Sequence, residues 1–525
     1  MKFDAKNVSL KVHALAFGLF LGLCIWKFGD PVILDRIIGA PATLQDFLED
    51  SWPTHWANWI LPPLVAWGAL LVFRGGVGSK SKIQNPKSDR GSAEASGKPQ
   101  SKFRVSGSAS GQAGTPPLPS KWLWLLPLVW LAWQLVSATQ TVAAGLTAAT
   151  LWQFGGCVAC YFLGIFVFGR GQLVRWLLVG VLAAFTFCLM RAVDQRLFEY
   201  PQNYQALVEG ERTGWTNFPP ATTLAMKGEG VILTTNGMDV ANPAILAKFL
   251  NGRVCGTLVY PNALAEIILL LWPVSLALAV GATRQLRPSV RYAAMALTVF
   301  LGGAAFFWTG SKLGWLLGIG LIGIVLLRQD WPKKLKLTAG AAVLVLGLGI
   351  FAVRFHHYFV AGATSAGARF DYWRAAVQIT ATHPAFGTGP GTFGQPYSRI
   401  KSPDSEMARL THNDYLEQFC DSGFVGGLAY TAWILLALIL LAMKVWPKPV
   451  LQKEARSRNR TEAPDAEAQT GGSALDDALR FALFLGLLGW FAQGLGEFGL
   501  YVPGLAWTAF ALLGCLIGRN LVSVD

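Results

Sequence analysis

The chain has 525 residues, of which 53% are hydrophobic and only 14% are charged. A soluble domain carries roughly 25% charged residues, so this composition excludes an ordinary water-soluble enzyme and indicates an integral membrane protein. The net charge of +14 does not require a nucleic-acid partner, because most of the excess lies in loops between apolar segments, as membrane topology predicts.

Apolar segments of membrane-spanning length recur along the whole chain. They lie near 12–28, 57–73, 122–138, 148–168, 176–190, 262–280, 292–308, 313–327, 337–353, 424–443, 481–496 and 500–517. A bilayer requires roughly 17–25 residues for each helix. The predicted fold class is therefore an all-α integral membrane protein with about twelve transmembrane helices.

The connections between these segments alternate in charge. The connection 74–121 carries nine Lys or Arg residues against Asp89 and Glu94, and basic residues recur in every second connection that follows. Positively charged loops stay in the cytoplasm, so both termini are predicted to be cytoplasmic. Three lysines precede the first apolar segment, but no clear small-residue cleavage site follows it, which predicts a retained membrane helix.

This topology divides the chain into membrane parts and loops. The membrane helices are expected in 1–73, 122–190, 262–353 and 424–525. The basic loop 74–121 and the loop 444–480 are predicted to be disordered in the cytoplasm, because they are rich in small and charged residues. The loops 191–261 and 354–423 are predicted to be extracytoplasmic. Long loops usually have a function, so the second is the predicted catalytic loop.

The seven cysteines do not form a disulfide framework. Cys157 and Cys160 form a C-x-x-C pattern, but both lie inside an apolar segment and are expected to be buried small residues. Cys255 and Cys420 both fall in the predicted outer loops, where a disulfide is permitted. Whether those two pair is left open.

Two polar motifs lie at the outer ends of membrane helices. NGRVCGTLVYPNALAEI, residues 251–267, places Arg253 and Asn262 near the outer interface, although Asn262 also suits a helix start after Pro261. WTGSKLGW, residues 308–315, places Lys312 in a short turn, where a lysine can also extend to the interface without any further role.

The catalytic loop begins with a segment of helical spacing, residues 368–384. Arg369, Tyr372 and Trp373 share one face of that helix. An anion-binding role for Arg369 and an ordinary solvated charge are both consistent with this pattern.

FGTGPGTFG, residues 386–394, formally matches G-x-G-x-x-G through Gly389, Gly391 and Gly394. The preceding strand that a dinucleotide site requires is missing, so a Rossmann site is rejected. Two readings remain: a turn whose amides approach a phosphate, and a tight turn without a ligand.

THNDYLEQF, residues 411–419, is the densest polar cluster of the chain. Asn413 and Glu417 would lie on one helix face, and Asn413 is also a good helix cap. A cap does not explain His412, whose side chain is well suited to exchange protons near neutral pH.

Taken together, these motifs resemble the O-antigen ligase and Wzy-type polymerase family. The resemblance rests on R-x-x-G-T-x-x-Y-P-N-x-L-A (Arg253–Ala265), G-S-K (310–312), R-x-x-x-W-x-x-A (Arg369–Ala376), H-P-x-x-G-x-G-P-G-T-F (His383–Phe393) and T-H-N-D-Y-L-E followed by G-x-x-G (Thr411–Gly426). It covers about a third of the chain. The sequence departs from the family at Lys312, where many relatives have Arg; Lys keeps the charge but loses the bidentate fork.

The resemblance implies a GT-C-like glycosyltransferase that acts on the periplasmic face of the bacterial inner membrane. Its donor would be a glycan on undecaprenyl pyrophosphate, and its acceptor a sugar hydroxyl on lipid A–core or on another glycan. Arg369 and His412 would be catalytic, and Arg253, Lys312, Gly389 and Gly391 would bind the pyrophosphate. Asn413, Glu417, Asn262 and Trp373 would support the site or the acceptor.

No cofactor is expected, and no metal-ligand pattern stands out, so the reaction is predicted to be metal-independent. Ligase is favoured slightly over the alternative, an O-antigen or exopolysaccharide polymerase. An alternative of another class is a lipid or polysaccharide transporter. Transporters usually keep ionisable residues near the bilayer midplane, whereas Glu266, Lys312 and Glu497 lie near predicted helix ends.

Overall fold

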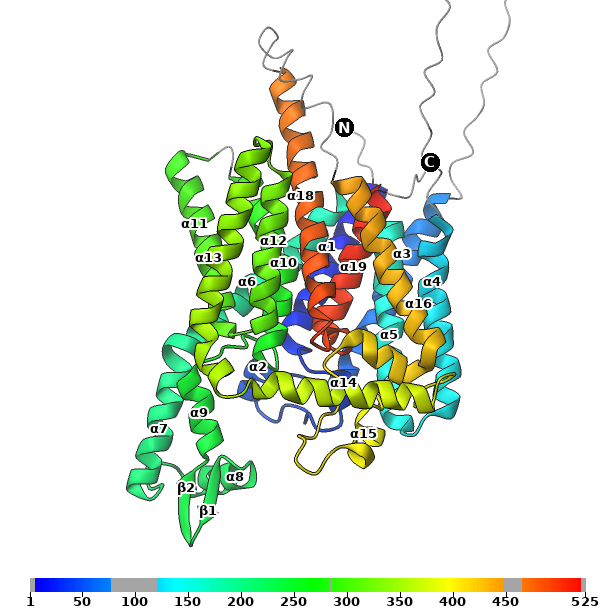
Figure 1. The fold of residues 1–525 in the computed structure, drawn as a ribbon. Coiled ribbons are helices and arrows are strands. Elements are labelled where there is room, and N and C mark those ends of the chain that lie inside the picture. Colours follow the sequence, from blue (N-terminus) through cyan, green and yellow to red (C-terminus); the bar gives the residue numbers. More distant parts are fainter. Residues whose placement is uncertain (1–4, 77–119, 171, 284–285, 447–464, 521–525) are drawn as a thin grey trace, which may run out of the picture.

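The computed structural model describes residues 5–76, 120–170, 172–283, 286–446 and 465–520, which form a helical bundle (Figure 1). In the first half, the helices of the bundle are α1 (Ala5–Lys27), α2 (Leu44–Glu49), α3 (His55–Gly76), α4 (Ser120–Ser137), α5 (Ala144–Leu163) and α6 (Leu173–Asp194). In the second half they are α10 (Pro261–Ala282), α11 (Pro288–Thr309), α12 (Lys312–Arg328), α13 (Lys333–Val360), α14 (Thr364–Thr382), α15 (Gly394–Ile400), α16 (Asp414–Val445), α18 (Asp465–Gln493) and α19 (Pro503–Asn520).

Every predicted apolar segment overlaps a helix, but some helices are longer than predicted: α16 begins ten residues before its segment and α18 sixteen residues before its own. Among the described residues, nine helices are long and apolar enough to cross a membrane. They are Asn7–Lys27, His55–Phe73, Lys121–Gln140, Ala144–Phe168, Leu173–Thr213, Pro261–Gly281, Pro288–Thr309, Lys333–Val360 and Asp414–Val445. The other three segments form α12, α18 and α19. The chain is thus a multi-pass membrane protein, and the count of twelve spans stays a prediction.

Helix α19 lies at the centre of the bundle, and small residues allow its neighbours to approach closely. All residues from Pro503 to Gly518 are buried, as expected of a helix that is apolar on every side. Helix α1, which packs against α19, crosses α6 at Gly18 and Gly180. A Cβ added to Gly18 would lie 2.1 Å from the Leu177 carbonyl oxygen. Close crossing at small residues is a usual means of packing membrane helices.

The two ends of the bundle differ. Helix α14 lies across one end, together with α2 and α15, whereas α1 begins and α19 ends at the opposite end (Figure 1). The end that carries α14 is called the outer end below, following the prediction that the loop 354–423 is extracytoplasmic. The side of the membrane that each end faces is itself a prediction.

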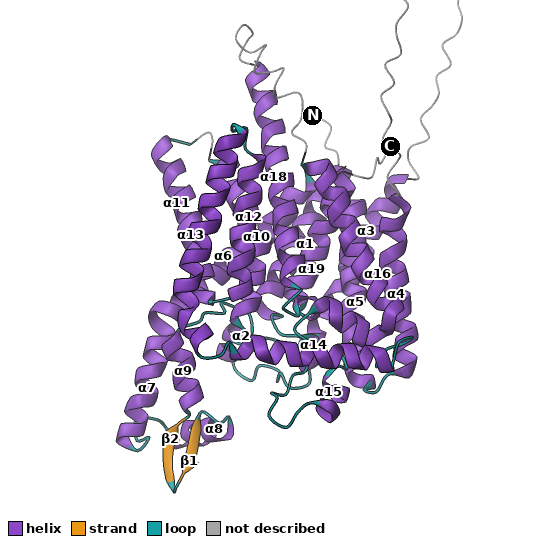
Figure 2. Cartoon of the chain, in the orientation of Figure 1, coloured by secondary structure: helices purple, strands orange, loops and turns teal. Residues whose placement is uncertain are grey.

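Residues 191–261 were expected to form a loop, but most of them are ordered in a small module at the outer end. Helix α6 continues through a π-helical turn into α7 (Tyr200–Thr213), which is followed by α8 (Pro220–Gly228), β1 (Ile232–Thr235), β2 (Met238–Ala241) and α9 (Pro243–Asn251). The two strands pair antiparallel (Figure 2). Among the described residues this short hairpin is the one departure from helical secondary structure, and the all-α fold class is otherwise confirmed. The signal in the sequence was Asn236-Gly237, a frequent two-residue hairpin turn, and both residues have positive φ.

The predicted loops elsewhere also contain helices. The segment 368–384 was predicted to be helical, and α14 confirms this. Disorder was predicted for 444–480, but α18 begins at Asp465. Two ion pairs help to fix this helix in the bundle: Asp476 pairs with Arg175 at 2.8 Å, and Asp477 pairs with Arg328 at 3.0 Å. Residues 447–464, and 77–119 of the predicted basic loop, lie outside the described residues.

Candidate active site

Side chains from five distant parts of the chain meet at the outer end of the bundle. Arg253 precedes α10, Lys312 begins α12, Arg369 lies in α14, and His412 precedes α16. The fifth part is the connection between α18 and α19, which supplies Glu497. Motifs that the sequence could only place on the same face of the membrane are therefore close together in space.

Glu497 joins these groups. Its side chain is only 1% exposed, and its Oε1 accepts a hydrogen bond from Asn262 Nδ2 at 2.7 Å. Arg369 forms an ion pair with the same oxygen. Oε2 lies 3.5 Å from His412 Nδ1. A buried carboxylate needs such partners, because leaving a charge unpaired away from water is costly.

Arg253 is held in place from two sides. Its Nε donates to the Thr309 carbonyl oxygen at 2.8 Å, and its guanidinium donates to Asn262 Oδ1 at 3.0 Å. Asn262 therefore connects Arg253 to Glu497. The Asn262 side chain thus bonds two other side chains. The other interpretation of the sequence was that it only bonds backbone groups at the start of the helix.

Lys312 lies over aromatic rings and does not extend away from the site. Its Nζ is 3.9 Å from the ring centroid of Tyr358, a cation–π contact. The pKa of Lys312 is lowered to about 8, mainly by burial and then by the positive charges of Arg253, Arg369 and Arg354, in that order of effect. Four cationic side chains thus lie within electrostatic range of one another and are called the cation cluster below: Arg253, Lys312, Arg354 and Arg369. Their mutual repulsion costs free energy, which is recovered where an anion binds.

His412 is presented by a strained backbone. Its φ is +51°, in the left-handed region that few non-glycine residues adopt. The imidazole lies between the rings of Tyr372 and Phe498, with centroids at 5.9 and 4.7 Å, and the side chain remains 30% exposed. Strain of this kind persists where the surroundings fix the residue, and it is often found at functional sites.

Asn413 and Glu417 support the turn that carries His412. Asn413 Oδ1 accepts hydrogen bonds from the amides of Tyr415 and Leu416 at 3.1 and 3.0 Å, which is the helix-cap role. Glu417 is buried, and its Oε2 accepts from the Thr411 amide. Both side chains therefore bind the backbone on either side of His412, which makes them positioning residues.

The glycine-rich turn does not direct its amides at the cation cluster. The Gly391 amide donates to Asp421 Oδ2 at 2.7 Å, and the Gly389 amide donates to the Asp421 carbonyl oxygen at 2.9 Å. Both glycines are buried. The expectation that these amides bind pyrophosphate is therefore not supported by their hydrogen bonds, because Asp421 already accepts them. The alternative reading, a tight turn without a ligand, describes this geometry.

The remaining residues singled out in the sequence are Trp373, Cys255 and Cys420. Trp373 packs against Phe370, and its indole Nε1 is buried without a partner among the described residues. Cys255 and Cys420 do not pair: both are free, and the Cys420 thiol lies 3.3 Å from the Ala376 carbonyl oxygen.

The sequence alone does not indicate that Glu497 belongs to the site, only that this ionisable residue lies near the end of a predicted helix. The sequence feature that could have indicated its role is a glutamate in G-E-F-G, between two apolar segments. An acidic residue at such a place needs a partner. Nothing in the local sequence indicates which partner that is.

This arrangement suits a transfer reaction with an anionic leaving group. Fixed cations stabilise negative charge that develops in a transition state. A histidine whose Nδ1 faces a carboxylate can accept a proton at Nε2, which is the role of the carboxylate–histidine pair in many enzymes. The distance of 3.5 Å between His412 and Glu497 is long for a hydrogen bond, but such bonds often tighten when substrate binds.

Comparison with protein families gives a match over part of the chain. A family model described as O-antigen ligase matches residues 297–431, about a quarter of the chain. The matched region includes Lys312, Arg369 and His412, and excludes Arg253 and Glu497. No curated protein matches the chain.

Proposed function

The match over residues 297–431 identifies the chain as a member of the O-antigen ligase family, and from that premise we propose its reaction. The protein transfers a glycan from undecaprenyl pyrophosphate to a sugar hydroxyl of lipid A–core. The reaction takes place at the periplasmic face of the inner membrane, where the outer end of the bundle lies. Both chain termini are then cytoplasmic.

The proposed reaction exchanges one bond at the anomeric carbon. The acceptor hydroxyl oxygen attacks that carbon, and the bond from the carbon to the pyrophosphate oxygen breaks. Its electron pair stays on the pyrophosphate, and the hydroxyl proton moves to His412 Nε2. Arg253, Lys312 and Arg369 stabilise the charge that develops on the leaving oxygen, which lowers the transition state more than the ground state.

The observation that carries this proposal is the position of Glu497. One buried carboxylate contacts Arg369 and Asn262, lies 3.5 Å from His412 Nδ1, and is linked through Asn262 to Arg253. Two of the groups that would bind the leaving group, Arg253 and Arg369, are thus connected through one carboxylate to the group that would accept the proton. Side chains supply the positive charge, so the proposed reaction requires no metal ion.

The test is the glycan profile of a deletion strain. Loss of a ligase should leave bare lipid A–core, with long glycans still attached to undecaprenyl pyrophosphate. Core capped by a single repeat would instead indicate a polymerase, and an unchanged profile would rule out both activities. Complementation with the wild-type gene should restore the profile, and complementation with His412→Ala should not.

A further inference from the structure

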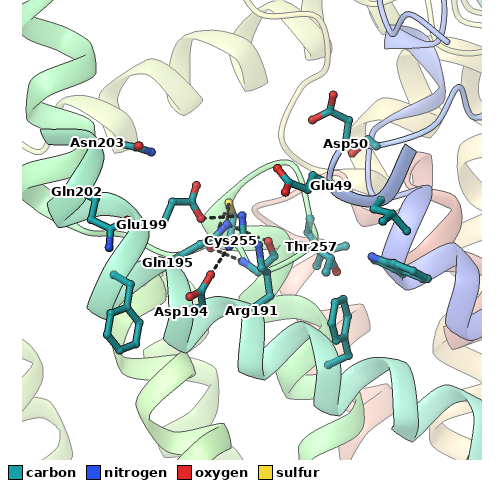
Figure 3. A pocket seen from close by; sticks show the side chains of 17 residues that line it. Glu49, Asp50, Arg191, Asp194, Gln195, Glu199, Gln202, Asn203, Cys255 and Thr257 are labelled. Atoms are coloured by element: carbon teal, nitrogen blue, oxygen red, sulfur yellow. Dashed lines mark hydrogen bonds and ion pairs between the residues drawn. The ribbon is translucent and has the colours of Figure 1, made fainter. Parts of the chain in front are cut away.

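A polar cavity lies at the outer end of the bundle, and none of the residues that line it belongs to the cation cluster. Its volume is about 770 Å³, which is within the range of roughly 300–1,000 Å³ found for small-molecule sites. Figure 3 shows Glu49 and Asp50 on one side, Gln202 and Asn203 on the other, and Cys255 between them.

The walls of this cavity are held in fixed positions by buried side chains. Gln195 Oε1 accepts hydrogen bonds from the amides of Cys255 and Gly256 at 3.1 and 2.8 Å. On the opposite side, the fully buried Lys27 donates to the carbonyl oxygens of Leu48 and Asp50 at 2.7 and 2.9 Å. The cavity is therefore preformed, which reduces the entropy cost of binding.

The lining is acidic, unlike the cation cluster. Its charged residues are four carboxylates, from Glu49, Asp50, Asp194 and Glu199, and one guanidinium, from Arg191. Arg191 is already paired with Asp194 and Glu199. A phosphate would be repelled from such a cavity, so the pyrophosphate of the donor does not belong here.

The same lining suits a polyhydroxylated ligand. Carboxylates accept strong hydrogen bonds from hydroxyl and ammonium groups, and the amides of Gln202 and Asn203 each offer a donor and an acceptor. Trp26 and Phe187 also line the cavity and contact each other edge to face at 5.4 Å. These apolar rings can pack against the C–H faces of a sugar.

One short loop connects this cavity with the proposed reaction site. Cys255 and Thr257 line the cavity, while Arg253, two residues before Cys255, belongs to the cation cluster. Two residues span at most about 7 Å. At the other end of the loop, Tyr260 stacks on Phe498, whose ring contacts His412.

We propose that this cavity binds a saccharide whose sugar residues are uncharged or carry amines, next to the point of transfer. This inference rests on the proposed glycan transfer and adds a subsite to it. The saccharide comes either from the lipid-linked donor or from the acceptor. The two sources share the same chemistry and are distinguished by the experiment below.

Cys255 provides a reporter for this cavity. All seven cysteines are free, six are buried, and only Cys255 is partly exposed. A cationic methanethiosulfonate reagent, which the acidic lining attracts, should modify Cys255 in the full-length protein. Two probes are then added separately: the oligosaccharide released from the lipid-linked donor by mild acid, and the core oligosaccharide freed of its lipid.

The probe that binds should slow the modification about tenfold when its concentration is ten times its Kd. Asp50→Lys should remove this protection, whereas Glu229→Lys, a matched change at an exposed residue of the outer module, should retain it. Protection by neither probe, or protection that survives in Asp50→Lys, would overturn the proposal.

Modification of Cys255 should also block transfer by the wild-type protein. The Cys255→Ser variant should transfer glycan at the same rate with and without the reagent. Transfer that continues unchanged after full modification of Cys255 would overturn the proposed subsite. The protection assay measures binding without transfer. An unchanged glycan profile in the deletion strain would therefore remove the proposed function even if protection is observed.

Discussion

Arg369 in α14 forms an ion pair with Glu497, a residue 128 positions later in the chain. The Arg369 side chain is 22% exposed and Glu497 only 1%. Arg369 can therefore reach a substrate, while Glu497 acts through the residues that it positions. The pair also ties α14, which lies across the outer end, to the connection between α18 and α19.

Glu497→Gln is expected to slow glycan transfer without unfolding the protein. Glutamine retains the size of the side chain and an oxygen that can accept from Asn262, but it loses the charge that faces Arg369 and His412. A charge-assisted hydrogen bond contributes about 1.5–3 kcal/mol, so the rate should fall by about 10- to 150-fold. The measurement is transfer in isolated membranes, normalised to the amount of inserted protein.

Glu229→Gln is the matched control for this change, because Glu229 is exposed and lies in the module formed by α7–α9. Its rate should equal that of the wild type. A wild-type rate in Glu497→Gln would show that the carboxylate does not position the site.

Apolar segments were enough to predict the positions of the helices, because a bilayer sets their length and composition. They could not predict which helices lie together. Glu497 and Asn262 are paired although 235 residues separate them, and no local pattern encodes that contact. The motifs around Arg369 and His412 were found because their residue types suit the chemistry, whereas Glu497 stands alone in an apolar region.

The glycine-rich turn is a second feature whose role could not be predicted from the local sequence. Its spacing is consistent both with amides that bind phosphate and with amides that bind protein. The choice depends on Asp421, about thirty residues later, whose carboxylate accepts from Gly391. Similarly, the hairpin at 232–241 has strands of only four residues each, too short for alternation to indicate a strand reliably.

His412→Ala is expected to lose transfer activity, because no other group would take the acceptor proton. Removing a general base typically costs about 10²- to 10⁴-fold in rate. His412→Asn is a second variant with the same expected loss. Asparagine tolerates the positive φ at this position better than most residues, so its folding should be preserved. The measurement is transfer in membranes together with the thermal stability of the purified protein.

His383→Ala serves as the control, since His383 is exposed and lies in the same segment. It should transfer glycan at nearly the wild-type rate. Near-normal transfer by the inserted His412→Asn variant would remove His412 from the mechanism.

The charge of Lys312 should make kcat/KM depend on pH in the alkaline range. The pKa of Lys312 is lowered to about 8, mainly by burial and then by the neighbouring arginines. As pH rises through that pKa, the amine loses its proton and its positive charge, so less charge stabilises the leaving pyrophosphate. We expect kcat/KM, which reports the free enzyme, to fall above about pH 8.

Lys312→Arg tests the cause of that fall. A guanidinium stays charged up to about pH 12, so the decline should move to higher pH. Lys312→Met, which is similar in length but uncharged, should be slow at every pH. If wild type and Lys312→Arg show the same alkaline decline, the titrating group is not Lys312.

Gly389→Ala is expected to lower stability more than it lowers the rate of transfer per folded molecule. Gly389 has φ of +102°, and an added Cβ would lie 2.3 Å from Thr141 Oγ1. Backbone strain of this kind costs about 1–3 kcal/mol, and the contact with Thr141 adds to it. Gly367→Ala is the control: it lies in α14 with open space around its Cβ position, where alanine stabilises a helix by up to about 1 kcal/mol. The measurements are Tm and transfer by the same preparation. A Gly389→Ala protein with unchanged Tm and strongly reduced transfer would instead restore the glycine turn as a pyrophosphate site.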